Sequence, residues 1–518
     1  MIARIFSTLV PLALLMLAPS PARAAWHEAS SDHFVIYADD DEQEIRRYAE
    51  NLERYHSAME HFTGRTVEKP SPSNRVTVYA IGSADQVRRL AGSSGVAGFY
   101  IPRAEGSVAF VQDIRNKDGY PDLSTVVLLH EYAHHFLSST DRFAMPLWMN
   151  EGAAEFFSAA YFREDGSVFL GMPSSQRSFT IFWKEEEMTP VREVLDLDWS
   201  RLNGRVGKSK DSFYGRSWLL YHYLSMSEER TGQLREYWLE VLRGTPSLDA
   251  AQLVFGDLGV LERQLNRHIR DRDRKSYHVG PDEITVSPIT LRRLDEGEAA
   301  IMDIRIRADR GVAPEEAQSL AAEARALEGR FPDNANVLTV LAETEYGAGN
   351  DRAASEAADR ALALDAQLVD AYLYKGLAGF RLARGMSDLV QRDAAYGRAI
   401  EPLRALAAIE PDHTVPLVYA YRYHAERGAV PPSDAKEAFA RAARLAPFDQ
   451  ELWLLTGMMH MNDGRIADAR AALQPLASNP HGGDKAEQVR GLLAFLADKP
   501  EGRPIPVQDA ISAYFIEE

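Results

Sequence analysis

Cysteine is absent from all 518 residues of this chain, and that absence excludes several chemistries at once. Without a thiol the protein has no disulfide, no thiolate-ligated metal and no cysteine nucleophile. An excess of positive charge is missing as well, because 58 Lys and Arg against 76 Asp and Glu leave a formal net charge of -18. Proteins that bind nucleic acids need a basic surface to displace counterions from phosphates, so we expect no nucleic-acid partner.

Long apolar runs are scarce too, with one short exception at the N-terminus. Met1–Arg4 supplies a positive charge, residues 5–18 are apolar, and Ala22-Arg23-Ala24 is a small-residue cleavage site. This layout is typical of a secretory signal peptide, here residues 1–24, and indicates an exported protein that is periplasmic or secreted. A retained anchor is the alternative, but the apolar run is shorter than the ~20 residues of a membrane span. We therefore expect no membrane span after signal cleavage.

The remaining sequence has two halves of different character. The first mixes patterns: Glu42–Phe62 places apolar residues at helical spacing, whereas Arg75–Ile81 alternates as a strand does. Val279-Gly280-Pro281-Asp282 is a candidate linker. The sequence after it is rich in Ala, Leu, Arg and Glu with helical periodicity. Beyond the signal peptide we therefore expect an α+β domain at 25–280, an all-α domain at 287–500 and a C-terminal tail at 501–518.

The second half also repeats. Arg330–Asp333 ends one helix pair, and Ala363–Ala366 ends the next about one 34-residue period later. The segment resembles tetratricopeptide (TPR) repeats, whose helix pairs stack because one pair cannot bury its own apolar face. A TPR-like domain implies a surface that binds a protein partner or a substrate. A plain α-helical bundle is the alternative, since the spacing between Tyr372 and Trp453 is irregular.

The central motif of the first half is His130-Glu131-Tyr132-Ala133-His134. Residues four apart lie on one face of a helix, so His130 and His134 can reach the same zinc ion at ~2.0–2.1 Å. Glu131 lies beside the metal rather than on it. It is placed to act as the general base that takes a proton from zinc-bound water.

A second helical segment, Pro146–Phe157, carries two further carboxylates. A catalytic zinc needs a third protein ligand and an open position for water, and Glu151 supplies that ligand. Glu155, one turn further on, is a candidate to accept a hydrogen bond from the outer nitrogen of a liganding histidine. An ordinary exposed carboxylate is the alternative for Glu155.

The two motifs together, His-Glu-x-x-His and Asn-Glu-Gly-x-Ala-Glu, resemble those of the gluzincin clan of zinc metallopeptidases. In particular they are similar to bacterial peptidase MA-like proteins, which join such a domain to helical repeats. The resemblance implies a zincin-like metallopeptidase fold for 25–280, with Zn2+ held by the two histidines and Glu151 rather than Glu155. It also implies hydrolysis of peptide bonds in an extracytoplasmic peptide or protein substrate.

The resemblance further implies a tyrosine that begins a helix and stabilises the developing oxyanion. Tyr214 fits this pattern, although Tyr214, Trp218 and Tyr221 also form an apolar helix stripe. The Gly-x-Met-Glu-Asn segment that grips the substrate amino terminus in related aminopeptidases is absent from the sequence. Endopeptidase action is therefore favoured over aminopeptidase action.

Two expectations concern how the protein meets other chains. The strand predicted at Ser107–Val111 is a candidate to pair with an extended substrate backbone. A function of a different class is the alternative to catalysis: a catalytically inactive metal-domain scaffold whose TPR-like repeats mediate protein–protein interaction. Chelator-sensitive cleavage of peptides would separate the enzyme from the scaffold.

Overall fold

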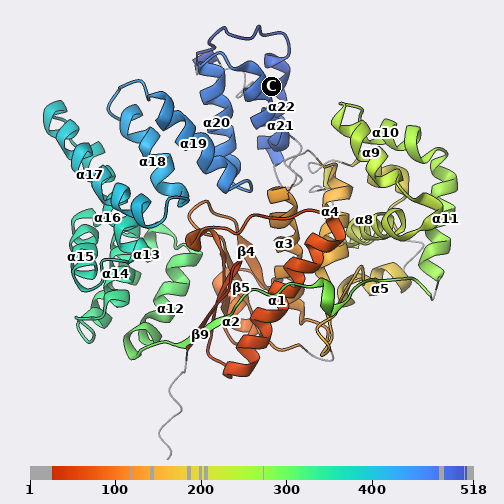
Figure 1. Cartoon of the computed structure of the whole chain (residues 1–518), viewed down its shortest axis with the longest axis horizontal. Helices are drawn as coiled ribbons and strands as arrows, with labels where there is room; N and C mark the ends of the chain where they lie inside the picture. Colours follow the sequence, from red (N-terminus) through yellow and green to blue (C-terminus); the bar gives the residue numbers. More distant parts are fainter. Residues whose placement is uncertain are drawn as a thin grey trace, which may run out of the picture.

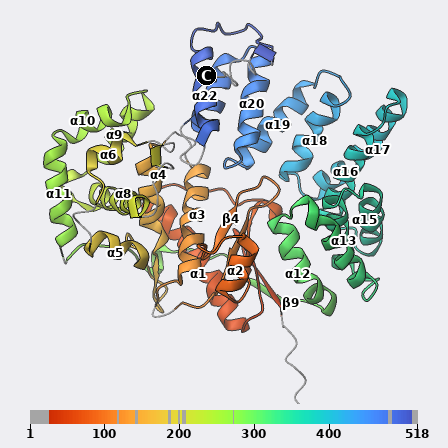
Figure 2. The same cartoon turned by 180° about the vertical axis from the view of Figure 1, so that it is seen from behind.

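A computed structural model of the chain describes residues 26–506 and 508–509, apart from 117–118, 141–144, 184–187, 198–200, 203–207, 272 and 478–482. The predicted signal peptide, 1–24, lies outside the described residues, as does most of the predicted tail. The described chain forms a mixed α/β part and a curved array of helices that arches over one side of it (Figure 1). Figure 2 shows the same arrangement from behind.

A six-stranded sheet lies at the centre of the α/β part, with the strand order β4-β5-β3-β2-β1-β9. Its three inner strands β2, β3 and β5 are parallel, and β4, β1 and β9 are added antiparallel towards the two edges. The strands are β1 (His27–Ser30), β2 (Phe34–Ala38), β3 (Val76–Ala80), β4 (Phe99–Ile101), β5 (Val108–Val111) and β9 (Thr290–Arg293).

Strand β2 shows why both faces of this sheet are covered. All five of its residues are buried, and neighbouring side chains of a strand point to opposite faces. Phe34 and Ile36 enter the main core, which also contains residues of helix α1 (Glu42–Thr63). Val35 and Tyr37 enter a second core with residues of helix α12 (Glu296–Arg310), the first helix of the array. The sheet is therefore the layer on which the two halves of the chain meet.

The segment around the predicted linker takes part in both sheets of the α/β part. Strand β8 (Tyr277–Val279) pairs with β7 (Val168–Leu170), which also pairs with β6 (Tyr161–Phe162). Strand β9 then pairs with β1 along its whole length, within the range that the sequence assigns to the helical domain. A Gly-Pro turn marks a change of direction, but it does not prevent the chain on either side from pairing.

The remaining helices of the α/β part follow the central sheet strands in sequence or enclose the main core. They are α2 (Ala84–Ala91), α3 (Leu123–Thr140), α4 (Leu147–Ser158), α5 (Ser175–Trp183), α6 (Val191–Asp196), α8 (Lys208–Met226), α9 (Gln233–Leu242), α10 (Ser247–Phe255) and α11 (Leu258–Arg270). None of the helices in the described part of the chain is both long and apolar enough to cross a membrane.

From residue 296 to residue 496 the described chain is a succession of packed helices, which confirms the predicted helical half. After α12 they are α13 (Pro314–Glu328), α14 (Ala335–Gly347), α15 (Asp351–Leu364), α16 (Val369–Arg384), α17 (Leu389–Ile409), α18 (Thr414–Ala425), α19 (Ser433–Leu445), α20 (Gln450–Asn462), α21 (Ile466–Ala477) and α22 (Gly483–Leu496).

The array buries its apolar residues in separate clusters along its length, as stacked helix pairs do and a single bundle does not. Small residues mark where the two helices of a pair approach closely. A Cβ added to Gly376 of α16 would lie 2.5 Å from the Leu403 side chain of α17. One added to Gly457 of α20 would lie 2.7 Å from Leu473 of α21. Gly376 and Gly457 therefore occupy equivalent positions in their two helix pairs, α16–α17 and α20–α21.

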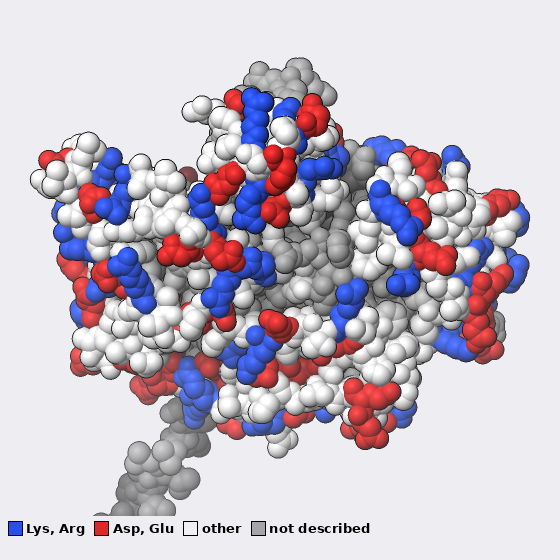
Figure 3. All heavy atoms as spheres, turned by 45° about the horizontal axis from the view of Figure 1, so that its top comes forward, with Lys and Arg blue, Asp and Glu red and all other residues white. Residues whose placement is uncertain are grey.

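On the face drawn in Figure 3, charged side chains lie over both parts of the chain. On the face drawn in Figure 3, acidic and basic side chains of the described residues lie interspersed rather than gathered by sign. A surface that binds nucleic acid collects its lysines and arginines on one face or in one stripe. No such collection of basic side chains is seen among the described residues on this face (Figure 3).

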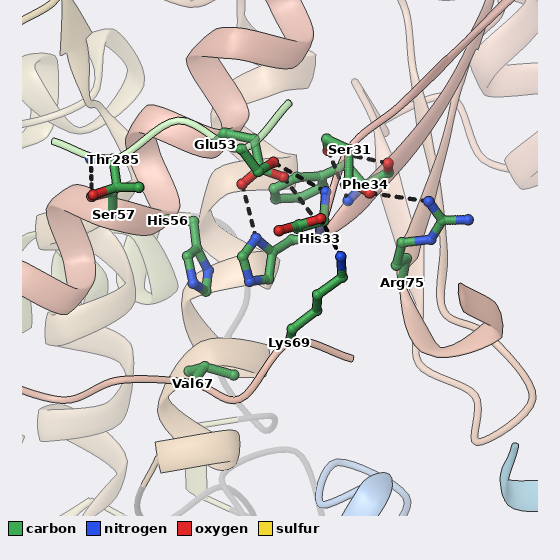
Figure 4. A network of polar contacts seen from close by, with 12 residues as sticks. Ser31, His33, Phe34, Glu53, His56, Ser57, Val67, Lys69, Arg75 and Thr285 are labelled. Atoms are coloured by element: carbon green, nitrogen blue, oxygen red, sulfur yellow. Dashed lines mark hydrogen bonds and ion pairs between the residues drawn. The ribbon is translucent and has the colours of Figure 1, made fainter. Parts of the chain in front are cut away.

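A polar network ties the start of β2 to helix α1 (Figure 4). Glu53 accepts a hydrogen bond from the backbone N–H of His33 at 3.0 Å, and its other carboxylate oxygen lies 2.8 Å from Nδ1 of His33. The ring of His56 stacks on that of His33 at 3.7 Å and is hydrogen-bonded to the Tyr132 hydroxyl at 2.7 Å. The network thus supports the buried side of helix α3 through Tyr132.

Candidate metal centre

Helix α3 carries the first motif and is fixed at both its start and its buried face. The Asp122 carboxylate accepts hydrogen bonds from the backbone N–H groups of Ser124 and Thr125, at 2.8 and 3.4 Å, as a capping side chain does. Leu129, Ala133 and Phe136 on one face are buried in the main core. His130 and His134 occupy a different face, half-buried.

Helix α4 brings Glu151 to the two histidines. One oxygen of its carboxylate, Oε2, lies 3.4 Å from Nε2 of His130 and 3.6 Å from Nε2 of His134. The two Nε2 atoms are 3.2 Å apart. Two ligand atoms that are each ~2.0–2.1 Å from a tetrahedral ion lie ~3.3–3.4 Å from one another, so the three side chains fit a zinc ion. Among the described residues, these are the three that the structure brings together as a candidate metal-holding group.

Each histidine has a partner for its outer nitrogen. Nδ1 of His134 is 2.8 Å from Oδ1 of Asn150, and Nδ1 of His130 is 3.6 Å from Oε1 of Glu155. A partner at Nδ1 leaves the Nε2 lone pair directed at the metal position and fixes the ring orientation. Glu155 is only 4% exposed, so it is not the ordinary surface carboxylate that was the alternative for it. The role of Asn150 was not predicted from the sequence.

The carboxylates act electrostatically on His134. Burial disfavours the charged imidazolium, but the negative charges of Glu151 and Glu131 and hydrogen bonds outweigh it and raise the pKa of His134 to about 9. A metal cation at the same position would replace the proton as the partner of these negative charges. The centre is therefore built to hold positive charge.

Arg177 of α5 is a second residue whose role was not predicted from the sequence. Its Nε donates to Oε1 of Glu155 at 3.0 Å, and its Nη1 donates to Oδ1 of Asp211 on α8 at 2.5 Å. The guanidinium also lies over the ring of Tyr214, 4.7 Å from its centre. Arg177 therefore joins the partner of His130 to the predicted oxyanion tyrosine. Nothing in its local sequence marks it, because its partners come from other helices.

Tyr214 reaches the centre because α4 and α8 approach each other closely. A Cβ added to Gly152 would lie 2.5 Å from the backbone oxygen of Ser217 on α8, so only glycine permits this spacing. The ring of Tyr214 is 6.4 Å from that of His130. Burial and the nearby Glu151 charge raise the pKa of Tyr214, which keeps its hydroxyl protonated and able to donate a hydrogen bond.

His135 connects the metal helix to its surroundings instead of facing the metal. Its Nδ1 is hydrogen-bonded to the Tyr100 hydroxyl of β4 at 3.0 Å, and its ring stacks on that of Phe448 at 4.5 Å. Burial is the main cause that lowers the pKa of His135 to about 3, so the ring is neutral. Helix α3 is thereby attached both to strand β4 and to the start of α20 in the helical array.

The expectation that Ser107–Val111 pairs with a substrate is wrong. Strand β5 is already hydrogen-bonded on both sides, to β3 and to β4, so it has no free edge. The edge of the sheet next to α3 is β4, whose outer backbone groups face away from β5. Strand β4 was not predicted from the sequence, because Phe99–Ile101 is short and follows a glycine-rich segment.

Comparisons with known proteins found similarity over 35–36% of the chain. No family model and no curated protein matches the sequence. Among solved structures, TTC0263, a thermophilic TPR protein of Thermus thermophilus, is 17% identical and covers 35% of this chain and 91% of its own, with a TM-score of 0.29. Two structures of MamA are 18% and 19% identical, cover 36% and 35% of this chain and 95% and 93% of their own, and have TM-scores of 0.27.

Proposed function

We propose that this protein is a zinc-dependent peptidase of the gluzincin type that acts on an extracytoplasmic peptide or protein. The observation that carries the proposal is the meeting of two imidazole nitrogens and one fully buried carboxylate, with all three ligand atoms within 4.8 Å of one another. His130, His134 and Glu151 would hold the ion. Three protein ligands with one position left over is the arrangement of a catalytic rather than a structural zinc.

Bound zinc would supply a water of lowered pKa and a positive charge for the carbonyl oxygen. Glu131 accepts the proton of that water during attack and returns it to the leaving amine. Tyr214 donates a hydrogen bond to the developing oxyanion. Glu155 and Asn150 keep the two imidazoles in position throughout.

The substrate backbone is expected to add to the sheet at β4. An extended peptide can pair with an exposed strand edge through its own N–H and C=O groups. Tyr100 of β4 is hydrogen-bonded to His135, the residue that follows His134, so a peptide paired with β4 would run alongside helix α3. A sheet edge of this kind binds the middle of a chain, which favours an endopeptidase.

Metal analysis tests the centre first. Residues 25–518 are expected to contain about one zinc per chain, and a Glu151→Ala variant is expected to lose it. Glu131→Gln is expected to keep zinc and to lose hydrolysis, because it removes the base and leaves the ligands. Hydrolysis retained by Glu131→Gln would refute the mechanism, and wild type that takes up no zinc on reconstitution would refute the centre.

A second candidate is a binding protein whose metal domain is catalytically inactive. The observation that favours it is a large groove on the concave side of the helical array, a surface of the kind through which helical repeats bind partners. A digest of a broad peptide library with and without a chelator separates the two. Chelator-sensitive cleavage supports the peptidase, and its absence supports the scaffold.

A further inference from the structure

The helical array encloses a cavity of about 980 Å³ on its concave side, here called the concave groove. Its walls come mainly from α14, α16, α18 and α20, the alternate helices of the array, and from the loop between β4 and β5. The volume is at the upper end of the ~300–1,000 Å³ of typical ligand pockets, which leaves room for a short extended peptide.

The loop between β4 and β5 is held firmly as one wall of the concave groove. The Thr414 hydroxyl donates a hydrogen bond to the carbonyl oxygen of Ala104, and Ala104 packs against the apolar core of the last helices. Nearby, the backbone N–H and the hydroxyl of Ser73 donate to the Glu410 carboxylate at 2.8 and 2.9 Å. The β4–β5 loop of the α/β part thus forms one wall of the concave groove, and the helical array forms the rest.

The lining combines aromatic and apolar side chains with an excess of negative charge. Tyr374, Phe439 and Met459 are among its apolar surfaces. Its charged members are Arg103, Glu105, Glu343, Arg422, Asp449 and Glu451. The four acids outnumber the two arginines, and Arg422 is also held at 2.6 Å by Glu426, a carboxylate outside the lining that pairs with Arg384 as well.

A smaller cavity of about 280 Å³ adjoins the concave groove and shares with it Arg103, Glu105, Glu343, Leu373 and Tyr374. It adds Asp309 and Asp370, with Arg305 as their nearby cation. Burial, the largest effect, raises the pKa of Asp309, Asp370 and Glu343 in spite of Arg305. A raised pKa favours the neutral acid, and a cation placed among these carboxyl groups would stabilise their charged form instead.

Packed side chains connect the wall of the concave groove to helix α3. His135, next to the ligand His134, contacts Tyr100 of β4 on one side and Phe448 on the other. Phe448 directly precedes Asp449, which lines the groove. Strand β4 leads into the β4–β5 loop, whose residues 103–105 line the groove, so a chain that pairs with β4 and extends in that direction would reach the groove.

We propose that the concave groove binds an extended basic segment of the polypeptide substrate and directs a lysine or arginine side chain towards Glu343. That the bound segment belongs to a substrate rests on the proposed peptidase function, whereas the binding of a basic segment does not. Charge complementarity selects this occupant. An ammonium or guanidinium group gains attraction from the unmatched carboxylates and from the tyrosine rings, whereas an acidic segment adds repulsion.

Binding is tested without cleavage in the zinc-loaded full chain carrying Glu131→Gln. Three short fluorescein-labelled peptides of otherwise identical sequence carry lysine, acetyl-lysine or glutamate, since acetylation removes the charge and keeps the stem. Fluorescence anisotropy is expected to show the lysine peptide binding about tenfold more tightly than the acetyl-lysine peptide, and the glutamate peptide weakest. Equal affinities for the three peptides, or preference for glutamate, would overturn the proposal.

Two variants locate the site, and a third serves as the matched control. Glu343→Gln, at the junction of the cavities, and Glu451→Gln, on the exposed start of α20, are each expected to lower the preference for lysine over acetyl-lysine. Glu356→Gln, exposed on α15 and outside the groove lining, is expected to leave it unchanged. An unchanged preference in Glu451→Gln and Glu343→Gln would overturn the proposal, even if one of them is less stable.

The outcomes separate this inference from the proposed function. Charge-selective binding without any zinc-dependent cleavage by the wild type would support the concave groove as a basic-segment site and refute the peptidase function. Zinc-dependent cleavage without charge-selective binding would support the peptidase function and refute the assignment of the groove as a basic-segment site.

Discussion

Replacing Gly152 by alanine tests the packing that builds the metal centre. The new Cβ would lie 2.5 Å from the Ser217 carbonyl oxygen of α8, whereas ordinary contacts begin at 3.4 Å. Helices α4 and α8 must therefore separate locally by about 0.9 Å, or their backbones must distort to the same extent. Metal–ligand distances tolerate only ~0.2 Å, so the neighbouring Glu151 can no longer meet both histidines at ligand spacing.

The magnitude follows from two opposing effects. Overpacking of a core costs ~1–3 kcal/mol, while alanine is favoured over glycine inside a helix by about 1 kcal/mol. We expect a net destabilisation of up to about 2 kcal/mol for Gly152→Ala. Gly397 of α17 is the matched control, because an added Cβ there meets no atom within 4 Å. Gly397→Ala is expected to stabilise by about 0.4–1 kcal/mol.

Two assays check this reasoning. Thermal unfolding followed by circular dichroism gives the order of stability, with Gly397→Ala above wild type and Gly152→Ala below it. Zinc titration against a chromophoric chelator gives the affinity, which we expect Gly152→Ala to lower by at least about tenfold and Gly397→Ala to leave unchanged. A Gly152→Ala variant as stable as Gly397→Ala, with wild-type zinc affinity, would show that the close approach of α4 and α8 does not hold the centre together.

Three further predictions concern single side chains. Tyr214→Phe is expected to lower kcat by about 10²-fold with zinc content unchanged, and an unaltered kcat in steady-state kinetics would remove Tyr214 from the mechanism. Arg177→Met releases Glu155 and should weaken zinc binding by about 10–100-fold, with partial recovery in Arg177→Lys; equal affinities in a chelator competition would contradict this. Burial favours the neutral form of Glu53, but hydrogen bonds and charge from His33 prevail and lower its pKa from 4.5 to about 2. Glu53 therefore adds stability that is complete above about pH 4.5 and is lost as the pH falls towards 2, on the order of 3 kcal/mol. Urea unfolding across that window should show a shallower loss for Glu53→Gln, and parallel curves would exclude the assignment.

Much of the candidate centre could be predicted from the sequence because its defining relationships are local. His130 and His134 are four residues apart on one helix, and helix geometry alone places them on one face. Glu151 was found because the chemistry of a catalytic zinc requires a third ligand, and the next helix carries a carboxylate in a distinctive setting. The helical half could also be predicted from the sequence, since apolar periodicity and a repeat of about 34 residues can be read along the chain.

The strands and the supporting residues were harder to predict because they depend on partners distant in the sequence. Strand β4 is short, and only its pairing with β5 makes it the free edge in place of Ser107–Val111. Strand β9 looks like the start of the helical half, and only β1 makes it part of the sheet. Asn150 is the first residue of the second motif, yet its role becomes visible only in the structure, where its Oδ1 lies 2.8 Å from Nδ1 of His134.

The sequence by itself therefore indicated the three candidate metal ligands and the proposed general base, and it determined the helical character of the second half, because each of these follows from residue types and spacing along the chain. Only the tertiary structure decided that Arg177 joins Glu155 to Tyr214, that Gly152 sets the distance between two helices, and that the array and the β4–β5 loop enclose one groove. Those features arise where elements from distant parts of the chain pack together, and packing depends on shape and burial that no single segment contains.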